Sequence, residues 1–140
     1  MEAEKCDVLP DLSEPLGRFR QRLREMVETC RQKRVRLIFV SSVTFYRKDL
    51  PPEDRDIVWG GKLADGRYLT ERGLREGFDL FNQALKEVAE EMNVEFVDLS
   101  PLNEQPKLFY DGSHFNVEGA RQVADIVADH FLARRSGNRW

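Results

Sequence analysis

The feature that most constrains the fold is the alternation of two short apolar runs with three long amphipathic segments. The runs Val35–Val40 and Val94–Leu99 are rich in β-branched and aromatic residues. Such runs are typical of strands that are covered on both faces of a parallel sheet. The longer segments space their apolar residues by three and four positions, which indicates amphipathic helices. Helices that alternate with parallel strands predict an α/β fold.

The three expected helices are Glu14–Gln32, Glu71–Met92 and Ala120–Leu132. Ser13 and Asn116 stand just before the first and the last of them, where their side chains can cap the free N–H groups. Asn93 suits a left-handed exit from the second helix. The stripe expected to face the core on the last helix is Ala120, Val123, Ala124, Val127 and Phe131.

Two strands are too few for a stable sheet, since sheets usually have about 4–6 strands. Either more strands lie in the irregular segments or part of the domain lies outside this chain. The longest irregular segment is 43–69, which holds Pro51-Pro52, Gly60-Gly61 and four aromatic residues. A connection of this length is usually functional, so we expect a lid-like loop. The alternative is a surface excursion whose aromatic residues pack locally.

The length of 140 residues fits a single domain, 1–140, with a frayed tail at 136–140. The 22 basic and 25 acidic residues give a net charge of -3, so no positive field favours nucleic acid or an acidic membrane as a partner. The basic residues of the first helix alternate with Glu25 and Glu28 and indicate a solvated surface.

Cysteine content and hydropathy say little about the compartment. Cys6 and Cys30 are too few for a disulfide scaffold, although one bridge stays open. No apolar run approaches the ~18 residues of a membrane span, and the first residues do not resemble a signal peptide. We therefore expect a soluble chain, cytoplasmic by default.

Only two histidines are present, which narrows the search for a proton-transfer residue. His130 is expected near the end of the last helix, where a polar residue has a structural explanation. His114 is expected in a loop between a buried strand and a helix, the usual place of function in open α/β sheets. Asp111 precedes it by three positions and can hold one imidazole nitrogen, which leaves the other as a general base. The alternative is an Asp-Gly turn whose histidine only packs at the helix entrance.

The block Tyr110–Gly119 and the helix after it resemble the C-terminal half of the SGNH or GDSL hydrolases, which are serine esterases and lipases. In that family an Asp-x-x-His block precedes the last helix. The resemblance implies a three-layer α/β/α sandwich with a flavodoxin-like parallel sheet, with His114 as general base and Asp111 as its orienting acid. It covers roughly Leu16 to Leu132, and two further stretches match in order: Phe81–Leu85 with Val94–Leu99, and Phe19–Met26 with Val35–Ser41.

The other blocks of that family do not map onto the chain. It has no Gly-Asp-Ser nucleophile segment and no Gly-x-Asn-Asp oxyanion segment. Together with the strand count, this favours a C-terminal portion of an SGNH domain whose nucleophile is not evident here. Ser41 and Ser42 end a strand but lack the small-residue elbow that exposes such a hydroxyl. Ser113 is too close in sequence to His114 to reach its distal nitrogen.

The first functional prediction is therefore an ester hydrolase of serine mechanism, of which this chain carries the Asp-x-x-His half. It needs no cofactor, and no histidine, cysteine or carboxylate spacing matches a metal site. The expected partners are a small-molecule ester and either a second copy or the missing N-terminal half. An acyl carbohydrate, a phospholipid and a simple ester all fit as substrates. The alternative is a non-catalytic binding or interaction module on a truncated scaffold.

Overall fold

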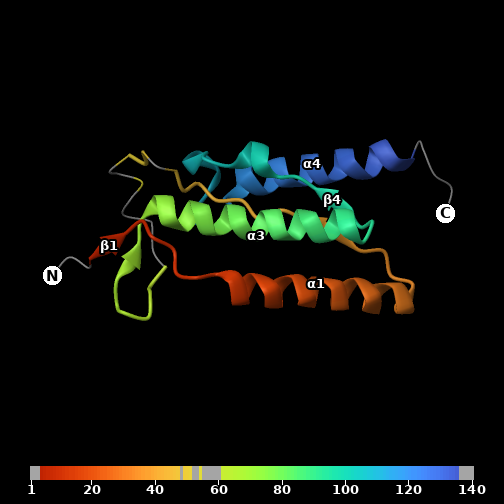
Figure 1. Ribbon diagram of the computed structural model, residues 1–140. Coiled ribbons are helices and arrows are strands. Elements are labelled where there is room, and N and C mark those ends of the chain that lie inside the picture. The colour runs from red at the N-terminus through yellow and green to blue at the C-terminus, as the bar shows by residue number, and fades with distance from the viewer. Residues whose placement is uncertain (1–3, 48, 52–53, 55–60, 136–140) are drawn as a thin grey trace.

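The computed structural model describes residues 4–47, 49–51, 54 and 61–135 (Figure 1). Its strands are β1 Lys5–Cys6, β2 Ile38–Val40, β3 Tyr68–Leu69 and β4 Glu95–Val97. Its helices are α1 Ser13–Lys33, α3 Glu71–Glu91 and α4 Val117–Arg135, with the short 3-10 helices Ser100–Leu102 and Pro106–Leu108 between β4 and α4.

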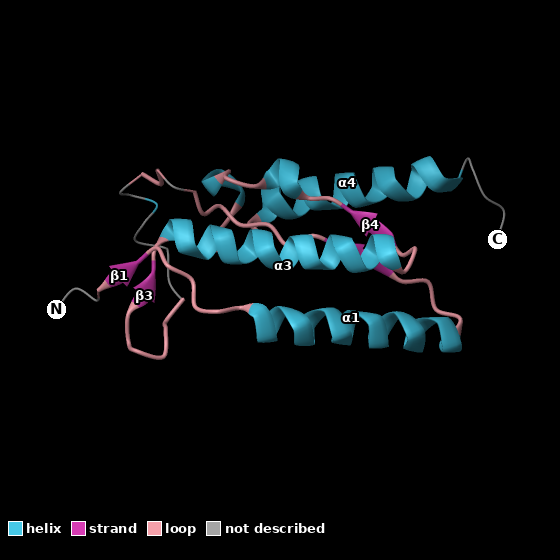
Figure 2. Cartoon of the chain, in the orientation of Figure 1, coloured by secondary structure: helices cyan, strands magenta, loops and turns pink. Residues whose placement is uncertain are grey.

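The parallel pair of β2 and β4 forms the centre of the molecule. Phe39 lies opposite Phe96 in the register, and Val40 lies opposite Val97. The pair lies between α4 on one face and α3 with α1 on the other (Figure 2). Because neighbouring residues of a strand point to opposite faces, each strand contributes to both helix layers. The prediction of an α/β fold with parallel strands is confirmed.

Each face of the strand pair has its own apolar core. On one face, Leu23 and Val27 of α1 meet Val88 and Ala89 of α3 over Phe39. The other face is larger and collects buried residues from β4 and from the irregular segments, with α4 packed against them. Its members are Val43, Phe45, Tyr46, Leu50, Val97, Leu99, Leu102, Leu108 and Phe109.

The basic residues of α1 form ion pairs at the surface. Arg20 and Arg24 bind Glu87 and Glu91 of α3 at 2.8 and 2.6 Å. Two further arginines pair with acids of α1 itself, at Arg18–Glu14 and Arg31–Glu28. Exposed pairs of this kind contribute about 0.2–1 kcal/mol each, so they align the two helices more than they stabilise the fold.

Two of the predicted helix ends agree with the structure, and the predicted cap of α1 does not. Asn116 accepts the Gly119 N–H at 3.0 Å, and Asn93 adopts a φ of 50°, both as predicted. Ser13, however, is not the cap of α1, because the helix begins at Ser13 and its N-cap residue is Leu12. The Ser13 N–H is bound at 2.9 Å by the carboxylate of Asp11 instead. This acceptor lies two residues earlier and takes the place of a cap.

The stripe predicted for α4 is wrong at three of its positions. Ala120 and Ala124 are exposed, and Phe131 keeps 39% of its surface in solvent under the Arg36 guanidinium. The residues that pack inward are Val123, Ile126 and Val127. The helix therefore faces the core with a different side than predicted, and near its start Gly119 lies directly against the backbone of Leu108, a contact that the sequence period does not reveal.

The strands are shorter than predicted, and two more are present. β2 and β4 have 3 residues each, and β1 pairs in parallel with β3 in a separate sheet. Thus β3 is a strand hidden in the expected loop 43–69. That loop also opens with core residues, since Val43 to Tyr46 are buried. Most of 52–60 lies outside the described residues, so a lid there stays a prediction.

Neither cysteine is bridged. Cys6 in β1 and Cys30 near the end of α1 are both free thiols, so the disulfide left open by the sequence is not formed. Of the helices in the described ranges, none is long and apolar enough to cross a membrane.

Candidate active site

His114 and Asp111 form a hydrogen-bonded pair in the loop before α4. The imidazole Nδ1 lies 2.8 Å from Oδ2 and 2.9 Å from Oδ1 of Asp111. A carboxylate in this position accepts the Nδ1 proton, so the neutral ring keeps Nε2 as its basic nitrogen. The His114 side chain is 70% exposed and that of Asp111 is 25% exposed. The basic nitrogen is therefore open to an incoming group while the carboxylate is shielded.

The Asp111 carboxylate also organises its own loop. Its Oδ1 accepts the backbone N–H groups of Ser113 at 3.0 Å and of His114 at 2.9 Å. These two bonds, followed by the bond from the imidazole, hold the pKa of Asp111 below its ordinary value. The ionised carboxylate thus favours the folded loop at neutral pH. Its contribution is lost as the pH falls through the lowered pKa.

A short antiparallel bridge closes the loop behind the pair. The Tyr110 N–H donates to the His114 carbonyl at 2.8 Å, and the Asn116 N–H donates to the Leu108 carbonyl at 2.9 Å. The rings of Phe109 and Phe115 stack beside it with centroids 4.8 Å apart. The loop is fixed at both ends, so His114 is exposed but stands on a rigid base.

Thr44 and Tyr46, which follow β2 in the chain, contact this loop. The Thr44 hydroxyl donates to the Gly112 carbonyl at 2.9 Å and accepts the Tyr46 N–H at 3.2 Å. The Tyr46 hydroxyl lies so close to Gly112 that a Cβ there would be 1.9 Å from it. Burial, and then the charge of Asp111, raise the pKa of Tyr46 above its ordinary value. Position 112 therefore requires glycine, because the Tyr46 hydroxyl leaves no room for a Cβ.

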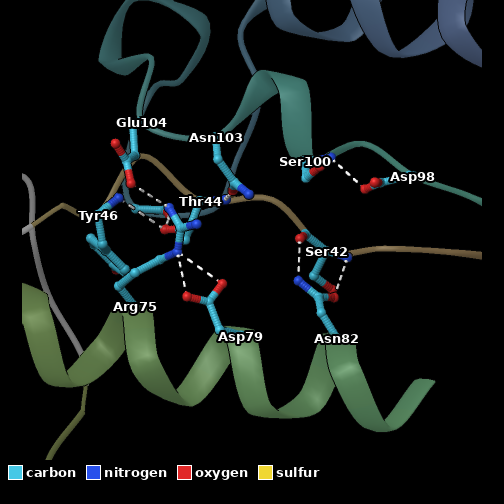
Figure 3. A network of polar contacts seen from close by, with 11 residues as sticks. Ser42, Thr44, Tyr46, Arg75, Asp79, Asn82, Asp98, Ser100, Asn103 and Glu104 are labelled. Atoms are coloured by element: carbon cyan, nitrogen blue, oxygen red, sulfur yellow. Dashed lines mark hydrogen bonds and ion pairs between the residues drawn. The ribbon is translucent and has the colours of Figure 1, made fainter. Parts of the chain in front are cut away.

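The segment after β2 is itself tied to its neighbours (Figure 3). The Asn82 side chain of α3 accepts the Ser42 N–H at 2.8 Å and donates to the Ser42 carbonyl at 2.7 Å. The Thr44 N–H donates to the Asn103 side chain at 3.0 Å. The sequence pattern did not predict these roles of Thr44 and Tyr46. The available signal was a threonine among large apolar residues directly after a strand.

Among the described residues, the serines near the strand ends form no hydrogen bond with the imidazole of His114. Ser41 is buried, and its hydroxyl accepts the Leu99 N–H at 2.8 Å. Ser42 is exposed, with its backbone bound to Asn82. Ser113 lies in the loop itself. Within the described ranges, the imidazole of His114 is hydrogen-bonded to Asp111 alone.

His130 lies at the other end of the strand pair. Its Nε2 is 3.1 Å from Oε2 of Glu95, the first residue of β4, and its side chain is 17% exposed. Arg36 binds the same carboxylate at 2.7 Å. This half-buried cluster joins α4 to the sheet and supports the structural explanation for His130. Among the described side chains, no group of three histidines, cysteines or carboxylates could hold a metal ion.

The family model of the GDSL-like Lipase/Acylhydrolase family matches residues 11–122. The chain belongs to this family. The match runs from the start of α1 through both central strands and includes Asp111 and His114. It confirms the family resemblance and places the chain among hydrolases of the ester and lipase type. No curated protein matches the chain.

Gly119, near the start of α4 in this GDSL-like chain, should tolerate no side chain. A Cβ at Gly119 would lie 2.2 Å from the Leu108 carbonyl oxygen and 2.7 Å from the Phe115 ring. We expect Gly119→Ala to lower the free energy of unfolding by about 1–3 kcal/mol, the usual effect of overpacking. Urea unfolding followed by circular dichroism measures it.

Gly17→Ala is the matched control, since nothing lies within 4 Å of a Cβ at Gly17 in α1. It should raise the free energy of unfolding by about 0.5–1 kcal/mol through helix propensity. A gain in stability for Gly119→Ala equal to that of Gly17→Ala, or a neutral Gly119→Ala, would contradict the close contact with Leu108.

Proposed function

We propose that this chain supplies the histidine–carboxylate pair of an ester hydrolase, with His114 as general base and Asp111 as the group that orients it. The observation that carries the proposal is the 2.8 Å contact between Nδ1 and Asp111, with the imidazole exposed. Membership of an acylhydrolase family supports the type of reaction.

In the proposed reaction, Nε2 of His114 accepts the proton of a nucleophilic hydroxyl as its oxygen attacks the ester carbonyl. The same nitrogen returns the proton to the leaving alcohol. Water then hydrolyses the acyl-enzyme with His114 again as base. Asp111 stabilises the imidazolium in each step and keeps Nδ1 protonated.

We place the nucleophilic serine and the oxyanion-hole donors outside these 140 residues. Three observations support this. The sequence holds no Gly-Asp-Ser segment, the Ser41 hydroxyl is buried and engaged, and Ser42 does not stand in a small-residue elbow. The alternative function, a binding module without catalysis, is favoured by the lack of a serine contact to His114 in the described part of the chain.

The chain by itself should then hydrolyse esters little or not at all, because a base without a nucleophile offers no covalent route. The measurement is turnover of p-nitrophenyl acetate by the purified chain, with Ser42→Ala as the companion variant. Turnover that disappears in Ser42→Ala would contradict the proposal and make Ser42 the nucleophile.

In a protein completed with the segment that carries the nucleophile, His114→Ala should lower kcat by at least ~10², the usual contribution of general base catalysis. Asp111→Asn should also lower kcat strongly, since an amide can hold the wrong tautomer and leaves the imidazolium without a countercharge. The serine-protease example of this change loses ~10⁴. A smaller loss is expected here because an exposed imidazole can reorient through water.

His130→Ala is the control for these variants. It removes the contact with Glu95 and should reduce thermal stability while leaving kcat unchanged. Melting curves for all three variants separate catalytic from folding effects. Equal losses of kcat in the His114 and His130 variants, or unfolding of His114→Ala, would show that the Asp-x-x-His block is structural.

We further propose that the edge of β2 opposite β4 pairs with the missing half or with a second copy. Within the described ranges β2 pairs with β4 only, and Val40 on β2 remains 39% exposed. Unpaired edges of this kind invite another strand. The isolated chain should therefore elute as dimers or larger species in size-exclusion chromatography.

Val40→Lys should shift that distribution towards monomer, because a charge on an edge opposes strand pairing. Val35→Lys, at an exposed position before β2, should leave it unchanged. A sharp monomer peak with a cooperative melt for the unmodified chain would show that the edge needs no partner.

A further inference from the structure

A corner between the two 3-10 helices binds the segment that follows β2. Asn103 and Glu104 form this corner, directly after the helix that ends at Leu102. The Thr44 N–H donates to the Asn103 side chain at 3.0 Å, and the Thr44 carbonyl accepts the Glu104 N–H at 3.1 Å. Both backbone polar groups of Thr44, a residue that is only 1% exposed, are therefore bound by the corner.

Glu104 adopts a left-handed backbone conformation, with a φ of 61°. This conformation is unfavourable for a residue that carries a Cβ. A residue other than glycine keeps it where surrounding contacts impose it, and such positions cluster at functional sites. Two contacts hold Glu104 in this way: its N–H is bound to Thr44, and its carboxylate is bound to an arginine.

That arginine is Arg75 of α3, whose guanidinium lies between two carboxylates (Figure 3). It donates to Oε1 of Glu104 at 2.9 Å, and its Nε donates to Oδ1 and Oδ2 of Asp79 at 2.9 and 3.0 Å. Asp79 lies one turn further along α3 and fixes the direction of the guanidinium. The Arg75 side chain is 23% exposed, so it is partly shielded from solvent. The ion pair with Glu104 joins α3 to the corner.

The contacts continue from Thr44 to the loop that carries His114. The Thr44 hydroxyl donates to the Gly112 carbonyl at 2.9 Å, which is the third step from Arg75 to the loop. Water cannot replace the partners of a buried backbone, so Thr44 keeps its bonds to the corner or moves with it. A displacement of the corner is therefore transmitted to Gly112.

We infer that Arg75 and Glu104 are positioning residues, which fix the His114 loop through Thr44. The catalytic consequence rests on the proposed function, because it requires His114 to act as a base. Among the described residues, the side chains of Arg75 and Glu104 bind each other and Asp79 rather than the loop itself. Their effect on the loop is therefore indirect, and loss of the ion pair leaves Glu104 free to abandon its left-handed conformation.

Hydrogen exchange of the full chain, followed by mass spectrometry, tests the positioning without catalysis. Arg75→Ala should speed exchange of the amides in 110–116 about 2–5-fold, the factor that corresponds to the loss of an ion pair near the surface. Glu104→Asn should have the same effect, because it removes the charge. Asparagine adopts the left-handed conformation readily, so this variant should fold as well as the unmodified chain.

Arg24→Ala is the matched control. It removes another ion pair between separate elements, since Arg24 of α1 binds Glu91 of α3 at 2.6 Å. It should reduce thermal stability as much as Arg75→Ala does, while exchange in 110–116 stays unchanged. This comparison separates positioning of the loop from a general loss of stability.

Substitutions at Thr44 test the path itself. Thr44→Val removes the hydroxyl, so it should speed exchange in 110–116, and Arg75→Ala added to it should have no further effect. Thr44→Ser retains the hydroxyl and should preserve the slow exchange. In the completed protein, Arg75→Ala should lower kcat by a factor similar to that of the exchange and leave KM unchanged.

Three results would overturn the inference: equal exchange in the Arg75→Ala and Arg24→Ala variants, additive effects of Arg75→Ala and Thr44→Val, or faster exchange spread evenly over the chain. An unchanged kcat in Arg75→Ala, where His114→Ala abolishes hydrolysis, would also overturn it. Exchange as expected with no ester hydrolysis by the completed protein would overturn the proposed function alone.

Discussion

The parallel pairing of β2 with β4 is the contact on which the other parts of the molecule depend. Parallel strands bring their C-terminal ends to one edge of the sheet, and here that edge is closed by the Ser41 N–H bound to the Val97 carbonyl at 3.1 Å. The Leu99 N–H then binds the Ser41 hydroxyl at 2.8 Å. Beyond Ser41, the Thr44 hydroxyl donates a hydrogen bond to the Gly112 carbonyl. The sheet register thereby fixes where the His114 loop stands.

The orientation of His114 comes from the loop more than from attraction between its ring and Asp111. An exposed pair of charges gains little in water, because solvent screens it. Asp111 is held instead by two backbone N–H groups, and the loop is closed by the bond between Tyr110 and the His114 carbonyl. The carboxylate is in place before any charge develops on the imidazole. This preorganisation is what the proposed role of His114 as a base requires.

The sequence predicted what local patterns determine. The bounds of α1 and α3 agree within two residues, because their apolar stripes are long and regular, and the Asp111–His114 contact spans only three positions. The sequence period did not predict that Ile126 of α4 faces the core or that Gly119 lies against the Leu108 backbone, because both depend on tertiary packing. Thr44 and Tyr46 were read as part of an irregular loop, since their burial arises from tertiary packing that no periodicity records. The apolar groove lined by Leu9, Phe19 and Phe78 likewise requires the segment before α1 and both helices α1 and α3 together.

Tyr46 reconciles two environments that would otherwise conflict. An apolar core and an ionised carboxylate cannot share a boundary without desolvating the charge, which is strongly unfavourable. The Tyr46 ring packs edge-on against Phe45 and Phe78, on the apolar side. Its hydroxyl faces Gly112, and burial, followed by the charge of Asp111, raises its pKa. A residue with an apolar body and a polar tip therefore lets the apolar core approach the loop while the Asp111 carboxylate stays hydrogen-bonded and charged.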